Sequence, residues 1–221
     1  METYSPTERT LVRRRSQRGV YDKVQVHAIL DEGFICHVGF VIDGQPFVIP
    51  TAYARSGEQI YIHGSPASRL MRPAAGQEVD LCLTVTLVDG LVLARSSFHA
   101  SINYRSVVVL GKARQVTDLE EKREALRCFT NHVIAGRWEQ AKQPSERDLK
   151  ATSVLALPLE EVSAKVRTGP PIDDEEDYAL PVWGGVVPVI QSFGEPVPDD
   201  HILPGIPAPM LVSPGSRISR I

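Results

Sequence analysis

The chain has 221 residues, of which 43% are hydrophobic and 23% charged, so it can bury one substantial core and is not disordered throughout. Its formal net charge of -3 and pI of about 6.1 exclude a domain-wide basic field, which argues against nucleic acid or an anionic membrane as a partner. The N-terminus lacks the apolar run of a signal peptide, and no stretch approaches the roughly 20 apolar residues that cross a bilayer, so we expect a cytoplasmic protein without membrane contact.

Three segments differ in composition: a basic arm at residues 1–20, one main domain at 21–190 and a Pro- and Gly-rich tail at 191–221. The arm carries five arginines and few apolar residues, so we expect it to be solvated or to lie across a partner subunit. Residues 21–32 then predict a short helix that ends at Gly33. The tail is expected to be extended or disordered.

Regularly spaced strands with tight turns dominate the main domain. Asp43-Gly44 favours a two-residue type I′ hairpin turn, and Asp89-Gly90 predicts a second turn. Gly111 is a candidate bulge. The strands are expected at residues 34–42, 45–51, 59–63, 79–87, 91–98, 106–116 and 154–159, the last of these being the final core strand. This pattern predicts a mainly β fold with flanking helices, built as an antiparallel barrel or sandwich.

Two helices interrupt the strands. Apolar residues recur at helical intervals over residues 118–134, where Thr117 and Glu120 have the spacing of a capping box. A short helix is expected from Ser145, with Glu146 and Asp148 in its first turn. Residues beyond Lys165 are interpreted as loop because Pro, Gly and a run of acidic residues dominate them.

The cysteines and most histidines show no pattern of a metal site. Cys36, Cys82 and Cys128 are widely spaced and are expected to be reduced, with the first two on strands. Five histidines lack the spacing of metal ligands and are expected to be surface or packing groups, so no metal site is predicted. They are His27, His37, His99, His132 and His201.

The segment His63-Gly-Ser-Pro-Ala-Ser-Arg69 is the strongest candidate for a site. Ser65-Pro66 is typical of a helix start, because Ser accepts hydrogen bonds from the first amides and Pro suits the first helical position. Such a start presents N–H groups to an anion, and Ser68 and Arg69 would add a hydroxyl and a guanidinium for a phosphate. A capped helix start with an arginine is also common without a ligand, so these residues alone leave both interpretations open.

Four motifs together carry a resemblance to a known family. The 63–69 segment is preceded by Phe47-Val-Ile-Pro-Thr51 and followed by Asn103-Tyr-Arg-Ser106 and Ala164-Lys-Val-Arg-Thr-Gly-Pro-Pro171. In this combination the chain resembles the FMN-binding split barrels related to pyridoxamine 5′-phosphate oxidase. It looks most like the flavin-nucleotide-binding branch that includes nitroimidazole-resistance proteins, over approximately residues 22–189.

The resemblance implies a homodimer with FMN, or alternatively FAD, at the subunit interface. The phosphate would be held by the 63–69 segment, the flavin ring would lie beside residues 48–51, and Arg105 would stabilise reduced, anionic flavin. Without the resemblance, Val48 and Ile49 are equally ordinary strand core, and Trp183 a packing anchor. The implied cofactor-binding residues are Val48, Ile49, Pro50, Thr51, His63, Gly64, Ser65, Ser68, Arg69, Asn103, Tyr104, Arg105, Ser106, Lys165, Arg167 and Trp183.

The function expected from this resemblance is a flavin-dependent oxidoreductase that acts on a small, electron-poor substrate. No Gly-x-Gly-x-x-Gly follows a strand, so any NAD(P)H must visit the open flavin face, and no catalytic residue is identified. The C-terminal Arg-containing motif of pyridoxamine phosphate oxidases has no match in residues 177–189, so vitamin B6 oxidation is not favoured. The alternatives are a non-catalytic flavin-binding, storage or sensing module and a haem-binding split barrel, for which His63 is the nearest candidate axial ligand.

Overall fold

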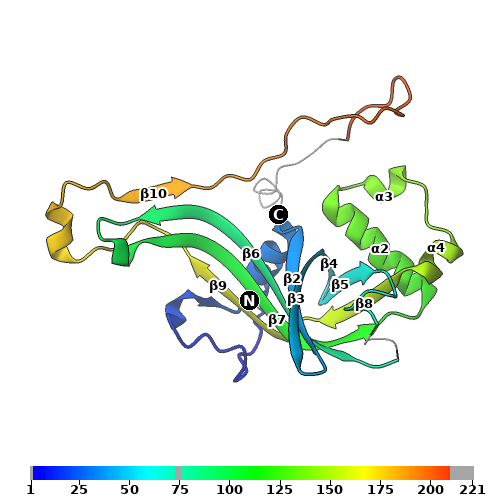
Figure 1. Cartoon of the computed structure of the whole chain (residues 1–221), viewed down its shortest axis with the longest axis horizontal. Coiled ribbons are helices and arrows are strands. Elements are labelled where there is room, and N and C mark those ends of the chain that lie inside the picture. Colours follow the sequence, from blue (N-terminus) through cyan, green and yellow to red (C-terminus); the bar gives the residue numbers. More distant parts are fainter. Residues whose placement is uncertain (1, 73–75, 210–221) are drawn as a thin grey trace.

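The fold is an antiparallel sheet that curls into a barrel, as the computed structural model describes it for residues 2–72 and 76–209 (Figure 1). The strands are β1 (Gly19–Val20), β2 (Ile35–Ile42), β3 (Gln45–Ala52), β4 (Ala54–Ser56), β5 (Gln59–Gly64), β6 (Val79–Leu93), β7 (Ser101–Gln115), β8 (Ser153–Pro158), β9 (Glu161–Arg167) and β10 (Gly185–Pro188). The helices are α1 (Lys23–Glu32), α2 (Leu119–Val133), α3 (Arg137–Gln140) and α4 (Glu146–Ala151), with 3-10 turns η1 (Ser16–Arg18), η2 (Ser97–His99) and η3 (Glu175–Ala179). The sheet order β3-β2-β6-β7-β8-β5-β4 confirms the predicted mainly β, antiparallel architecture with flanking helices.

The β2–β3 hairpin forms as the sequence predicts. Asp43 and Gly44 have φ angles of 50° and 78°, the left-handed pair that a type I′ turn requires. Side chains alternate along β2, so that Cys36 and Val38 are buried while His37 points to solvent. The strand therefore contributes one face to the core and leaves the other exposed.

The predicted turn at Asp89-Gly90 is wrong, because β6 continues through it. The register of β6 against β7 shifts between Val88 and Gly90, which marks a bulge. A Cβ on Gly90 would lie 2.9 Å from Cγ1 of Val186, so the glycine is needed where β10 pairs with β6. The hairpin turn lies instead at residues 94–100, and β6 and β7 extend together beyond the barrel with β10 alongside (Figure 1). This three-stranded extension is called the hairpin arm below.

Four strands and one helix escaped the sequence prediction. β1 and β4, of two and three residues, are too short for a sequence pattern to mark. β8 is not the final core strand, since β9 follows it and pairs with both β7 and β1. β10 lies within the stretch interpreted as loop and pairs with β6. β9 does alternate polar and apolar residues, as a strand with one buried face does, so its sequence signal was missed. β10 has only four residues and is fixed by the strand it pairs with. The short α3 was not expected, and Gly111 pairs with Leu81 without the candidate bulge.

Three helices form near the predicted positions. α1 is capped by Asp22 and ends at Gly33. α2 is capped by the side chain of Asp118, which accepts from Glu121 N, so the predicted cap at Thr117 is displaced by one residue. α4 begins with a capping box between Ser145 and Asp148.

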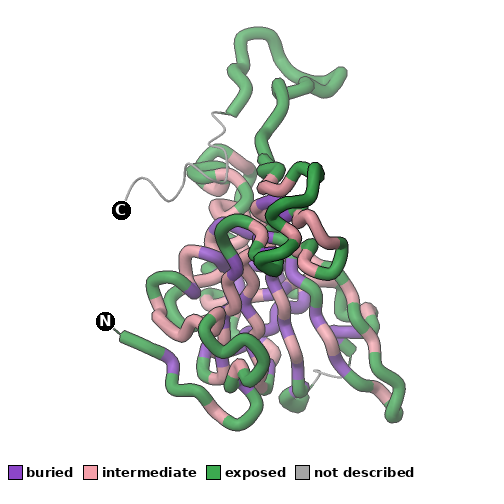
Figure 2. Tube along the Cα trace, turned by 90° about the vertical axis from the view of Figure 1, so that its left-hand side faces the viewer, coloured by how far each residue is buried: buried purple, intermediate pink, exposed green. Residues whose placement is uncertain are grey.

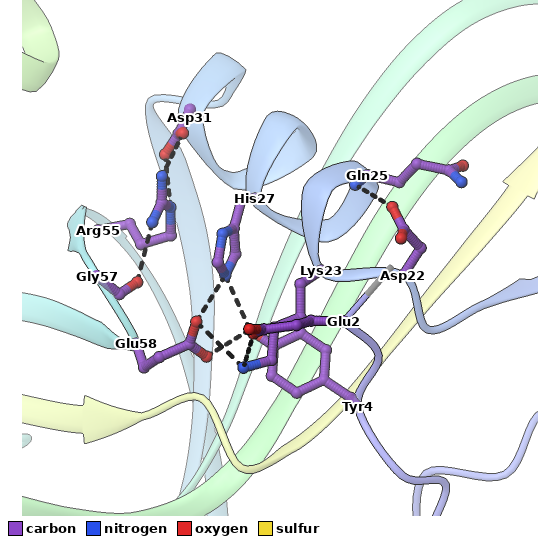
Figure 3. Close-up of polar contacts among 10 residues, drawn as sticks. All are labelled: Glu2, Tyr4, Asp22, Lys23, Gln25, His27, Asp31, Arg55, Gly57 and Glu58. Atoms are coloured by element: carbon purple, nitrogen blue, oxygen red, sulfur yellow. Dashed lines mark hydrogen bonds and ion pairs between the residues drawn. The ribbon is translucent and has the colours of Figure 1, made fainter.

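The N-terminal arm packs on its own barrel instead of remaining a solvated tail. Tyr4 is 5% exposed, and its hydroxyl contacts Nε2 of His27 and a carboxylate oxygen of Glu58, each at 2.9 Å (Figure 3). Burial and the bond to Glu58 raise the pKa of Tyr4. Lys23 pairs with Glu58 as well, so the arm is held by one polar cluster at the start of α1 (Figure 3).

The core lies between the curled sheet and α1, and buried positions alternate with exposed ones along the strands (Figure 2). Cys36 is buried, which raises its pKa to about 12, and Cys36, Cys82 and Cys128 are all reduced, as predicted. The largest fully buried side chains include Tyr53, Leu30, Ile60, Ile62, Leu83, Leu149, Leu155 and Leu157.

The tail has no helix or strand over residues 191–209 and is largely exposed (Figure 2). Phe193 contacts Phe34 with a ring centroid distance of 5.9 Å. Residues 210–221 of the predicted tail, and Pro73 after the predicted phosphate segment, lie outside the described residues. Among the helices of the described part, none has the length and apolar character needed to cross a bilayer.

Candidate functional site

The open edge of β3 carries the residues predicted beside a flavin ring. β3 pairs with β2 on one side, and within the described sheet no strand pairs with its other side. Val48 is 67% exposed, whereas Ile49 packs against the core, so the core alternative holds for Ile49 only. Alternate residues along 48–51 therefore present backbone polar groups at an edge that a ligand can reach, and Pro50 has only a carbonyl to offer.

The segment that follows β5 is a series of turns, so the predicted helix start is wrong. Ser65 Oγ accepts from Ala67 N and Ser68 Oγ accepts from Met71 N, both at 3.3 Å. Local bonds of this kind compete with helical ones, and a helix this short does not recover the cost of its nucleus. The segment retains hydroxyls and backbone amides close together, but without the dipole of a helix.

Arg69 connects these turns to β3. Its guanidinium carbon lies 4.5 Å from the centroid of the Phe47 ring, a cation–π contact. The structure thus brings the two halves of the predicted flavin site, residues 48–51 and 65–69, to the same side of the barrel. Arg69 itself is exposed.

His63 points away from the core towards α2. Its ring meets the ring of Phe129 edge-on at a centroid distance of 4.2 Å and lines a small apolar gap with Leu126. Burial lowers the pKa of His63, so the imidazole is neutral at neutral pH. A neutral ring of this kind is a metal ligand or a packing group, and not a cationic phosphate ligand.

Arg105 is engaged by two carboxylates. It binds both oxygens of Glu32, and it binds Asp89 with Nε–Oδ2 and NH2–Oδ1 distances of 3.0 and 2.7 Å. These bonds, to Glu32 first and Asp89 second, raise the pKa of Arg105. Its guanidinium is held between these two carboxylates, and the role predicted for it beside reduced flavin stays a prediction.

Asn103 and Arg167 form a second polar group at the far ends of β7 and β9. Arg167 NH1 donates to Asn103 Oδ1 and to the carbonyl of Gly169, and Asn103 Nδ2 donates to the same carbonyl at 3.1 Å. Tyr104 lies opposite Arg167 in the ladder, and Ser106 Oγ donates to the carbonyl of Lys165. These residues stand apart from Arg105, whose side chain points to α1.

A cavity of about 590 Å³ opens beside Arg167, and we call it the basic cavity. Five of its lining side chains are cationic and two are acidic, and residues 98–101 with Ile172 complete its wall. The cationic residues are Arg14, Arg15, Arg18, Lys165 and Arg167. The sequence signal for it was the run of arginines in the arm, which composition alone could not connect to β9.

His99 lies at the rim of this cavity beside acidic residues. Its Nε2 is 3.2 Å from Oδ2 of Asp174. Together with Asp177 the two offer ligand atoms within 4.8 Å of one another. His99 is 75 residues from Asp174 in the sequence, so spacing could not reveal this juxtaposition.

Trp183 is 63% exposed and lies between η3 and β10, at the outer end of the hairpin arm. Its ring covers Gly185, where a Cβ would come within 2.8 Å. A Cβ on the adjacent Gly184 would lie 2.7 Å from NH1 of Arg95, whose partner Asp173 lines the basic cavity. Trp183 therefore belongs to the region of the basic cavity and not to that of β3.

A family model described as pyridoxamine 5′-phosphate oxidase matches residues 22–166. The chain belongs to this family. The match confirms the resemblance drawn from the motifs, and the fold is the split barrel of the pyridoxamine 5′-phosphate oxidase family. No curated protein matches the chain.

Two solved structures match this family member over nearly its whole length. The flavocytochrome Anf3 from Azotobacter vinelandii is 45% identical, with a TM-score of 0.86 over 93% of this chain and 95% of its own. The FAD and haem binding protein from Mycobacterium smegmatis is 32% identical, with a TM-score of 0.82 over 87% and 94%. A putative 5-nitroimidazole antibiotic resistance protein from Bacteroides thetaiotaomicron is 23% identical over 67% and 86%, with a TM-score of 0.57, and shares the fold.

Proposed function

We propose that the chain is a redox protein that binds both a flavin and haem. The observation that carries this proposal is the near full-length similarity to a flavocytochrome and to an FAD and haem binding protein. The flavin is proposed to be FAD, in place of the FMN expected from the motifs, because the Mycobacterium smegmatis protein binds FAD. When bound, the flavin would exchange one or two electrons and the haem iron one.

The residues at the open edge of β3 fit a flavin. The edge offers backbone donors and acceptors for the polar rim of the ring, and Val48 offers an exposed apolar side chain beside it. The turns after β5 offer Ser65, Ser68 and the exposed Arg69 to a phosphate. Arg69 presents a fork of N–H donors that matches phosphate oxygens.

Haem requires an axial ligand, and two histidines are candidates. His63 has a neutral, half-buried ring against the apolar side chains of Leu126 and Phe129, and Phe129 would have to move to admit a porphyrin there. His99 has Nε2 beside Asp174, which leaves Nδ1 for a metal and provides the carboxylate that commonly orients a ligating imidazole. Replacing each by alanine separates the two candidates, because loss of the axial ligand abolishes or shifts the haem absorption band.

The second copy of the chain is proposed as a partner, with the flavin at the interface. The support is a row of apolar side chains on the hairpin arm: Val187, Leu91 and Ile102 are neighbours in register across β10, β6 and β7. Their exposed fractions are 43%, 44% and 45%. An exposed row across three strands is typical of an interaction surface and not of a solvated face.

The electron acceptor is proposed to be a small molecule that reaches the flavin or the haem. The electron-poor substrate class expected from nitroimidazole-resistance proteins has weaker support, since that similarity extends to the fold alone. A binding module without turnover would carry the same cofactors. Electron transfer between two cofactors in one chain is what distinguishes the redox protein.

The test is spectroscopic. The purified chain, reconstituted with FAD and haemin, is expected to show two flavin bands and a Soret band. Anaerobic photoreduction of the flavin should then shift the haem bands as electrons reach the iron. A chain that takes up neither cofactor would refute the proposal, and one that binds flavin without haem would reduce it to a simple flavoprotein.

A further inference from the structure

The basic cavity carries an excess of positive charge that the chain does not neutralise. Of its two acidic residues, Asp173 is fully committed: it accepts from the backbone amides of Arg95 and Ser96 and pairs with the Arg95 side chain. Asp174 faces His99. Among the ion pairs of the described residues, none involves the five cations that line the cavity.

Arg167 is the buried member of this group. The residue is 8% exposed, and its Nε is buried and has no hydrogen-bond partner. NH1 and NH2 bind neutral acceptors, Asn103 Oδ1 and the carbonyls of Gly169 and Pro170. A buried guanidinium without a carboxylate is costly, because only an opposite charge restores what it loses on leaving water.

The shape of the cavity adds a second requirement. Cations approach from two sides: Arg14, Arg15 and Arg18 from the arm, and Lys165 with Arg167 from β9. The two sides of the cavity are joined by a hydrogen bond, which Lys165 Nζ donates to the backbone carbonyl of Arg14 at 3.2 Å. Two walls of like charge favour a ligand with more than one anionic group.

Apolar side chains lie beside these charges. Phe98 and Ile172 line the same cavity and are 87% and 76% exposed. An aromatic ring this exposed at the mouth of a cavity offers a flat surface to a ligand. The cavity thus combines paired cations with an apolar platform.

We infer that the basic cavity binds a ligand that carries two neighbouring anionic groups on a flat apolar body. Two cofactors of the proposed function have this chemistry: haem through its paired propionates, and FAD through the diphosphate next to adenine. The choice between them rests on the proposed function, whereas the anion site itself does not. FMN carries one phosphate and no adenine, and it does not meet the requirement.

The test compares two variants of the full chain. Arg14→Gln/Arg18→Gln removes two cavity cations from exposed or half-exposed positions, and it keeps the Arg14 carbonyl that accepts from Lys165. Arg13→Gln is the control, because Arg13 is an exposed arginine of the same arm and does not line the cavity. Affinities for haemin, haemin dimethyl ester, FAD and FMN are measured by absorbance and fluorescence titration, and folding is checked by thermal unfolding.

The double variant should bind one cofactor roughly tenfold more weakly or worse, as expected when two charge-assisted contacts are lost, and Arg13→Gln should bind it normally. If the double variant binds haemin more weakly than the wild type does, but binds the dimethyl ester equally well, the cavity holds the propionates. Weaker FAD binding with unchanged FMN binding identifies the diphosphate. Unchanged affinity for both cofactors would overturn the inference.

Inorganic diphosphate separates failure of this inference from failure of the proposed function. If the wild-type chain binds neither haemin nor FAD, the proposed function fails, and the anion site is then judged by diphosphate alone. A rise in melting temperature for the wild type that the double variant lacks would support the site. No difference between the two proteins would reject it.

Discussion

The guanidinium of Arg105 on β7 binds both carboxylate oxygens of Glu32 at the end of α1, with an NH2–Oε1 distance of 2.8 Å. Its remaining donors bind Asp89 on β6. One side chain therefore fastens α1 to β6 and β7 where the hairpin arm leaves the barrel. Glu32 is 9% exposed, so its carboxylate is largely withdrawn from water.

Replacing Arg105 by methionine should lower the free energy of unfolding by about 3 kcal/mol, because it leaves the buried Glu32 carboxylate without its cation. Urea denaturation followed by circular dichroism measures the change. The control is Arg114→Met, whose partner Glu121 and own side chain are 29% and 47% exposed, and which should cost at most about 1 kcal/mol. Equal losses for the two variants would contradict a structural role for the Arg105 pair.

Gly90→Ala should loosen β10 from the hairpin arm. The added Cβ would lie 2.9 Å from Val186 Cγ1 and 3.1 Å from the carbonyl of Val187, so β10 has to move, at a cost of about 1–3 kcal/mol. Hydrogen exchange of the β10 amides should accelerate. Gly39→Ala is the control, since its nearest atom would be 3.5 Å away; faster exchange there as well would point to a general effect of strand glycines.

The two Asp-Gly pairs show how far the sequence predicts this fold. Asp43-Gly44 adopts the turn its local chemistry favours, and within the described residues no atom beyond its chain neighbours would lie within 4 Å of a Cβ built on Gly44. Asp89-Gly90 is the same dipeptide but forms a bulge within a continuous strand, because β10 pairs with β6 at this point. The local turn preference of a dipeptide predicts its structure where tertiary contacts are absent, and it fails where a segment distant in sequence packs against the dipeptide.

The candidate site also has parts that the local sequence predicts and parts that depend on distant segments. Residues 48–51 and 65–69 were predicted together and lie on one side of the barrel, since each is close to a strand that the pattern identifies. Arg105 was predicted from its motif, but its partner Glu32 comes from α1 and could not be anticipated. The basic cavity needed the arm to fold back on β9, a contact that the arginine-rich composition of the arm argued against.

Arg69→Ala should weaken flavin binding by roughly 1–3 kcal/mol, the scale of a lost charge-assisted hydrogen bond. Quenching of flavin fluorescence on titration with the protein measures it. Arg72→Ala removes the same charge from the same turns, although its NH2 donates to the carbonyl of Ala67 at 3.1 Å. If both variants lose affinity equally, the effect is one of general charge and the phosphate is not held by Arg69.

Stability should fall as the pH drops below about 6.5, in part because of His63. Burial lowers the folded-state pKa of His63 below its unfolded value, so the unfolded chain takes up a proton first and acid favours unfolding. His63→Gln should therefore flatten the slope of unfolding free energy against pH between about 7 and 5. His37→Gln, at an exposed position of β2, is the control. An unchanged slope for His63→Gln would place the acid sensitivity elsewhere.

Leu91→Arg should convert the proposed dimer into a monomer of 24.3 kDa, because Leu91 is the central member of the apolar row on the hairpin arm. Light scattering after size exclusion gives the mass directly. Val24→Arg is the matched control: Val24 is 66% exposed but lies on α1, outside the hairpin arm. If the wild type is itself a monomer, the row does not bind a second copy. If both variants dissociate, added charge and not the row causes the change. Dissociation by Leu91→Arg alone, with lower flavin affinity in the monomer, would place the flavin at the interface between the two copies.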